Sequence, residues 1–183
     1  MLPIRDVIPS RTTPWVVIAL LAAYATASAA ALIDHPGWLA VLANVVALAV
    51  FGETLEDRLG HGRFLAFGLL GASAAVAGWM WLDLAAPYAI AAATGGVASV
   101  LGGYLSLFPR SRVLVFVVID VVELPALIVV AFWAVLHAVA IDPLGAALLG
   151  RSLFAAQMIG LGVGAASVRL FRRRERVAPA WWS

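Results

Sequence analysis

Long apolar runs alternate along the chain with short polar or proline-containing breaks. Six runs lie near residues 14–33, 37–52, 64–82, 88–108, 119–139 and 152–171. The first carries no charge over about 19 residues, which is enough to cross roughly 30 Å of hydrocarbon and longer than the apolar part of a signal peptide. Because lipid cannot satisfy backbone polar groups, we predict that each run is a helix.

The arginines test this number of helices. All twelve basic residues are arginine. When successive loops are assigned to opposite sides of a membrane, one side receives only Arg151, and the other receives Arg5, Arg11, Arg58, Arg63, Arg110, Arg112 and the arginines of the C-terminal tail. Basic residues concentrate on the cytoplasmic side of membrane proteins. The sequence therefore predicts an all-α integral membrane protein with six transmembrane helices and cytoplasmic N and C termini.

Composition supports the same class of protein. The chain is 64% hydrophobic and 12% charged, with a mean hydropathy of +1.02, which is typical of a membrane protein. The absence of cysteine excludes disulfides and thiolate metal sites, and we expect no metal and no cofactor. Because the basic residues flank apolar runs, we expect lipid headgroups as their partners and no nucleic acid. The predicted headgroup anchors are Arg172, Arg173, Arg174 and Arg176.

Small residues recur at every fourth position in two runs. These predicted packing stripes are Gly95, Ser99 and Gly103 in the fourth run, and Ala156, Gly160 and Gly164 in the sixth. Small residues at this spacing let two membrane helices approach closely. If the stripes face each other, Thr94 and Gln157, each next to a stripe residue, are brought together. The second and fourth runs are predicted to be interior helices surrounded by the others.

Several motifs resemble those of one family. Residues 35–44 begin with His35 and end with Asn44, the charged segment 51–60 follows, Ala93-Thr94-Gly95 lies in the fourth run, and Ala156-Gln157 precedes a Gly-x-x-x-Gly in the sixth. In this order and spacing the chain resembles the rhomboid intramembrane serine proteases over residues 1–176. The resemblance implies a six-helix membrane domain over 1–176, with a basic and aromatic cytoplasmic tail over 172–183. Residues 1–6 are similar to the lead-in of bacterial members, so we expect the bacterial cytoplasmic membrane.

The resemblance also implies a catalytic site, from which this chain departs at three positions. The family uses a serine nucleophile, a histidine base and an oxyanion site that includes a second-helix histidine and asparagine. Here the three departures are Thr94 for the serine, Gln157 for the base and Ala40 for the second-helix histidine, while Asn44 is kept. A glutamine amide does not titrate near neutral pH and cannot act as a general base. Loss of one oxyanion donor typically costs about 100- to 1000-fold in rate.

We therefore predict a rhomboid-like pseudoprotease that binds transmembrane segments or membrane-protein partners without cutting them. Thr94 and Gln157 either bond to each other as structural glue or, with Asn44 and His35, bind a client. Two alternatives remain open at this point: an atypical, slow peptidase that uses Thr94, and a structural subunit of a larger membrane complex. Asp120 and Glu123 are predicted to lie at the cytoplasmic interface, just before a helix that begins near Pro125.

Overall fold

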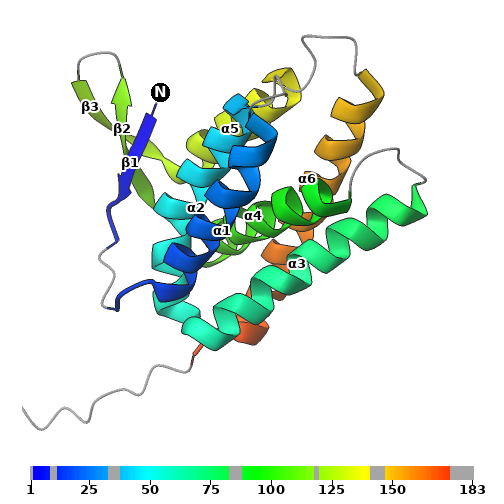
Figure 1. Cartoon of the computed structure of the whole chain (residues 1–183). Helices are drawn as coiled ribbons and strands as arrows, with labels where there is room; N and C mark the ends of the chain where they lie inside the picture. The colour runs from blue at the N-terminus through cyan, green and yellow to red at the C-terminus, as the bar shows by residue number, and fades with distance from the viewer. Residues whose placement is uncertain are drawn as a thin grey trace, which may run out of the picture.

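The computed structural model describes residues 2–8, 12–32, 38–82, 88–117, 120–140 and 147–173. Helices dominate this part of the chain, and a small antiparallel sheet lies at one side of the bundle (Figure 1). The helices are α1 (Trp15–Leu32), α2 (Trp38–Leu59), α3 (His61–Trp81), α4 (Tyr88–Leu107), α5 (Ala126–Ala140) and α6 (Ala147–Phe171). The strands are β1 (Leu2–Asp6), β2 (Arg112–Val117) and β3 (Asp120–Pro125).

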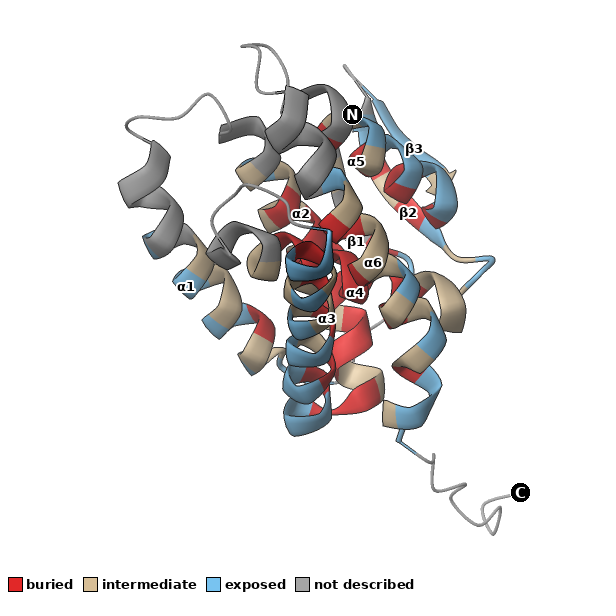
Figure 2. Ribbon diagram, turned by 90° about the vertical axis from the view of Figure 1, so that its right-hand side faces the viewer, coloured by how far each residue is buried: buried red, intermediate tan, exposed pale blue. Residues whose placement is uncertain are grey.

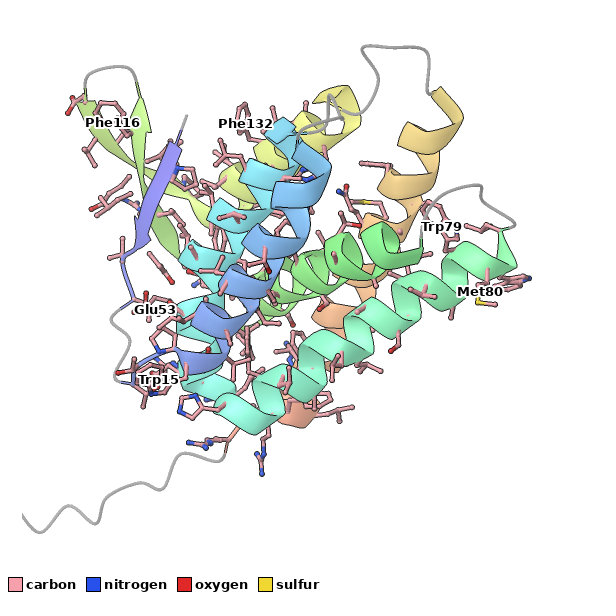
Figure 3. All side chains as sticks on the ribbon, in the orientation of Figure 1. Trp15, Glu53, Trp79, Met80, Phe116 and Phe132 are labelled. Carbon is pink, nitrogen blue, oxygen red and sulfur yellow. The ribbon has the colours of Figure 1, made fainter. Side chains whose placement is uncertain are left out.

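Helix α4 is the interior helix of the bundle, as its glycine- and alanine-rich sequence predicted. It packs against α2, α3 and α6, and its residues from Val97 to Tyr104 are all buried. The outer face of α3 is exposed along most of its length, whereas buried positions concentrate on α4 and on the inner face of α2 (Figure 2). At the far end of α3, Met80 projects away from the bundle and is 64% exposed, whereas Trp79 is buried (Figure 3).

The runs 37–52 and 64–82 predicted a break between two helices over the charged segment 52–63, and that prediction is wrong. Helix α2 continues to Leu59, and α3 begins at His61, so that only Gly60 separates the two helices. The helix continues because Leu55 and Leu59 are buried in the core and the carboxylate of Glu56 is used inside the protein. Gly60 then ends the helix with a φ of 81°, a conformation that favours glycine.

The sheet was not predicted. Residues 120–125 belong to the fifth run, which was predicted to be helical from near Pro125, but they form β3, which pairs with β2 in an antiparallel hairpin. Strand β1 adds to the other edge of β2. Helix α5 begins only at Ala126, so Pro125 ends a strand. The valine-rich sequence suits an extended strand, and pairing gives its backbone groups partners without a helix. Asp120 and Glu123 are both exposed on β3, and Glu123 lies 3.5 Å from Arg112.

Buried carboxylates fix the N-terminal segments to the helices. Asp6, at the end of β1, accepts hydrogen bonds from the hydroxyls of Thr54 on α2 (2.9 Å) and Tyr104 on α4 (2.6 Å). Glu56 on α2 accepts bonds from the first-turn N–H groups of α1, at Val16 (2.9 Å) and Val17 (2.8 Å). A helix start leaves four N–H groups without helical partners, so Glu56 acts as the cap of α1 from another helix.

Two helical segments in the described part of the chain are long and apolar enough to cross a membrane, His61–Trp81 and Phe154–Phe171. Shorter apolar segments lie at Trp15–Tyr24, Ala92–Leu107 and Ala126–His137. Long apolar helices of this kind are the elements that a bilayer requires.

Candidate functional site

The candidate site lies where α4 and α6 meet. A Cβ atom on Gly160 would clash with the backbone of Gly95, and one on Gly164 would clash with the backbone of Ser99. The two helices therefore touch backbone to backbone over at least one turn, which only glycine at 160 and 164 allows. This contact places Thr94 of α4 and Gln157 of α6 on neighbouring turns of adjoining helices, and both side chains are buried.

The two stripes of small residues have different neighbours. The α6 stripe faces α4, whereas the Cβ directions of Gly95 and Gly103 on α4 lead to Ala75 and Phe67 of α3. Ser99 is also met by α3, because a Cβ on Gly71 would strike its side chain. The α4 glycine that points directly at the α6 backbone is Gly102, which the predicted stripe did not include. Helix α4 is thus held closely on two sides.

Asn44 of α2 is the third polar residue of the predicted site. It is 1% exposed, and its Nδ2 donates a hydrogen bond to the hydroxyl of Tyr24 on α1 at 2.9 Å. Its Oδ1 has no hydrogen-bond partner among the described residues. The amide is therefore oriented by Tyr24 and keeps one buried acceptor for another group.

Gln157 is fully buried, yet neither Oε1 nor Nε2 has a hydrogen-bond partner among the residues described. A direct Thr94–Gln157 hydrogen bond, one of the two predicted roles for the pair, is therefore not formed. Leaving a buried polar group unsatisfied typically costs about 1–3 kcal/mol. An amide in this position can donate and accept hydrogen bonds, but it cannot take up a proton near neutral pH.

The described histidines have other surroundings. His61 lies 2.6 Å from the Glu56 carboxylate, about half exposed at the α2–α3 junction. His137 is buried on α5, with Nδ1 2.9 Å from the carbonyl oxygen of Trp133. Within the described ranges, no group of three or more His, Cys, Asp or Glu side chains is arranged to hold a metal.

Some predicted site residues fall outside the description. His35, Arg174 and Arg176 lie outside the described residues, and Ala40 is described only as part of the α2 backbone. Arg172 and Arg173 follow α6 and are exposed. Sequence reasoning missed Tyr24, the partner of Asn44, because nothing in the first apolar run marks which face of that helix meets the second.

The comparisons with known proteins agree with this geometry. The family model of the Rhomboid domain matches residues 14–174, which includes all six helices. No curated protein and no solved structure was found to match the chain. The family match covers most of the chain, from the helix capped by Glu56 to the end of α6, and the family is one of integral membrane proteins. The chain belongs to the rhomboid family.

Proposed function

We propose that this protein is a rhomboid pseudoprotease, which binds transmembrane segments or membrane-protein partners and does not cleave them. In the proposed topology six helices cross the membrane and both termini lie in the cytoplasm, which in a bacterium places the protein in the inner membrane. The one-sided arginine distribution supports this orientation. The core of the proposal is the loss of the chemistry that a peptidase needs.

The observation that carries the proposal is the amide at position 157. Where the family resemblance implies a histidine base, Gln157 offers a buried group that cannot accept the proton of a nucleophile. Without a base, the hydroxyl of Thr94 is a weak nucleophile. Its extra methyl group also restricts the side-chain rotamers available for attack.

The same groups are suited to binding. Gln157 has a donor and an acceptor without described partners, and Asn44 has an acceptor. A main-chain amide of a client segment presents the complementary acceptor and donor, so that the cost of burying these groups would be recovered on binding. In this proposal Thr94 and His35 complete the client-binding surface, and the glycine contacts of α4 and α6 hold it in shape.

A site-directed photo-crosslinker at Met158, next to Gln157 on α6, tests client binding in native membranes. Wild-type protein is expected to give discrete adducts with single-pass membrane proteins. Gln157→Leu should lose these adducts while its thermal stability stays equal or rises, because an apolar side chain of similar size removes two unsatisfied atoms. Ser167→Ala on the same helix is the matched control, since the Ser167 hydroxyl donates to the carbonyl of Val163 within α6 itself. Adducts that persist in Gln157→Leu would show that clients are not recognised here.

An atypical peptidase is the second candidate, and the retained Thr94 hydroxyl and the retained Asn44 amide, both buried, favour it. It predicts cleavage products in place of stable adducts, and loss of those products in Thr94→Ala. A structural subunit of a larger assembly would instead give one adduct of fixed stoichiometry and a large native mass.

A further inference from the structure

The end of the bundle at the α2–α3 junction carries a cluster of arginines from separate elements. The chain brings the end of α6 against this junction, because the backbone N–H of Arg173 donates to the carbonyl of Arg58 at 3.3 Å. Figure 1 shows the α2–α3 turn and the end of α6 at the same end of the molecule. We call Arg63, Arg172 and Arg173 the basic end. Two more arginines are close in sequence: Arg58 is five residues before Arg63, and Arg169 is three residues before Arg172.

Two guanidinium groups of the basic end, those of Arg63 and Arg173, lie against backbone. Arg63 Nη1 donates to the carbonyl oxygen of Arg172 at 3.2 Å. The guanidinium of Arg173 lies over Gly60, in the space that a Cβ would occupy at that position. In the described part of the chain, neither Arg63 nor Arg173 forms a salt bridge. Each guanidinium has five N–H donors, so most remain available to an external acceptor.

The nearby acids are directed elsewhere. Glu56 is fully buried and bonds to the N-terminus of α1 and to His61. Asp57 accepts a hydrogen bond from the hydroxyl of Thr12 at 2.8 Å, and the first turn of α3 has no acidic residue. Among the described residues, the exposed surface at this end is therefore positive, which suits an anion with several oxygens.

Exposed apolar side chains next to the basic end indicate that this anion is the headgroup of a lipid. Ala66 and Leu70 lie one and two turns beyond Arg63 on the same face of α3, and both are exposed, Leu70 at 41%. On α6, Leu170 is 84% exposed and lies two residues before Arg172. A ligand with a phosphate at Arg63 and Arg173 thus meets a strip of exposed apolar side chains along the helix.

We propose that the basic end is a binding site for an anionic phospholipid, whose phosphate is held by Arg63 and Arg173 and whose acyl chain lies along the Ala66–Leu70 face of α3. A planar guanidinium group can donate two parallel hydrogen bonds to two oxygens of one phosphate. This site is separate from the client-binding surface at Thr94 and Gln157, so either proposal stands without the other.

The test uses full-length protein in mild detergent, with phosphatidylglycerol and phosphatidylcholine as probes and bound lipid counted by native mass spectrometry. Each cationic side chain near an anionic surface contributes about fivefold in affinity. Arg63→Gln/Arg173→Gln should therefore weaken phosphatidylglycerol binding by about 30-fold and leave phosphatidylcholine binding nearly unchanged. The control Arg110→Gln/Arg112→Gln removes the same charge from two exposed arginines before and within β2, and should cost at most about threefold.

Equal losses in the two double variants would overturn the proposal, because they would show general attraction to charge. It would also be overturned if inorganic phosphate at millimolar concentration displaced phosphatidylglycerol, since the acyl contact would then contribute nothing. If the double variant does not fold, Arg63→Gln alone is expected to lose about fivefold, and unchanged binding in that variant would refute the site.

Discussion

The buried carboxylate of Glu56 gives the sharpest prediction for stability. It accepts hydrogen bonds from the N–H groups of Val16 and Val17 and contacts Nδ1 of His61, and the Glu56 side chain itself is fully buried. In Glu56→Gln the side chain keeps one carbonyl oxygen and gains an NH₂ group that cannot accept. One of the two α1 N–H groups would then face another donor, and the start of α1 would lose its anionic cap.

The magnitude follows from these bonds. A hydrogen bond to a charged group contributes about 1.5–3 kcal/mol, and a buried donor without a partner costs about 1–3 kcal/mol. We therefore expect Glu56→Gln to lower the free energy of unfolding by about 3 kcal/mol. For a chain of this length that corresponds to a decrease in Tm of roughly 6–12 °C.

Thermal unfolding followed by tryptophan fluorescence in mild detergent measures this shift. The matched control is Asp57→Asn, at the adjacent residue. The Asp57 carboxylate accepts an exposed hydrogen bond from Thr12, and the amide oxygen of an asparagine can accept the same bond. The Tm of this control should change by no more than about 2 °C, as expected for a surface substitution. If Glu56→Gln melted with the wild type, the Glu56 carboxylate would not be the group that secures the start of α1.

Three further predictions concern helix packing and the N-terminal strand. Gly160→Ala and Gly164→Ala should each destabilise the protein by at least about 2 kcal/mol, because the added Cβ atoms would strike the α4 backbone. Gly162→Ala should be neutral or stabilising, because nothing lies within 4 Å of a Cβ at that position. Equal Tm values for all three variants would refute the α4–α6 contact. Tyr104→Phe should cost about 1.5–3 kcal/mol through the lost bond to Asp6, and a wild-type Tm would show that this bond is not formed. Asp6→Ala should release β1, detected as faster proteolysis near the N-terminus with α2–α6 still protected, and an unchanged digestion pattern would argue against the anchoring role of Asp6.

Much of the helical fold could be predicted from the sequence, because five of the six apolar runs end within one residue of a helix end, at Leu32, Trp81, Leu107, Ala140 and Phe171. The prediction failed at residues 52–59, whose charged side chains indicated a break but which continue helix α2. Glu56 is a buried residue there, and its partners belong to α1, 39 and 40 positions earlier. Such a long-range pairing leaves no local signal.

The sheet was missed for a related reason. A valine-rich stretch reads equally as an apolar helix or a strand, and the requirement that backbone be satisfied in lipid favoured the helix. The structure meets the same requirement by pairing β2 with both β1 and β3. Here β1 supplies Asp6, whose bonds to α2 and α4 are again remote in sequence.

The sequence predicted which residues form the candidate site, but not how their polar atoms are hydrogen-bonded. Motif order placed Thr94, Gln157 and Asn44 on three helices, and the structure finds all three buried. Which atoms are satisfied depends on Tyr24 and on the exact approach of α4 to α6, and neither follows from residue spacing.

A cleavage assay bears most directly on the proposed loss of catalysis. Purified protein in liposomes is incubated for many hours with a single-pass rhomboid substrate, and the products are read by mass spectrometry beside Thr94→Ala. We predict that wild-type and Thr94→Ala samples both contain only intact substrate. A product formed by the wild type and absent in Thr94→Ala would mean that Thr94 is activated despite the amide at position 157, and the protein would be a peptidase.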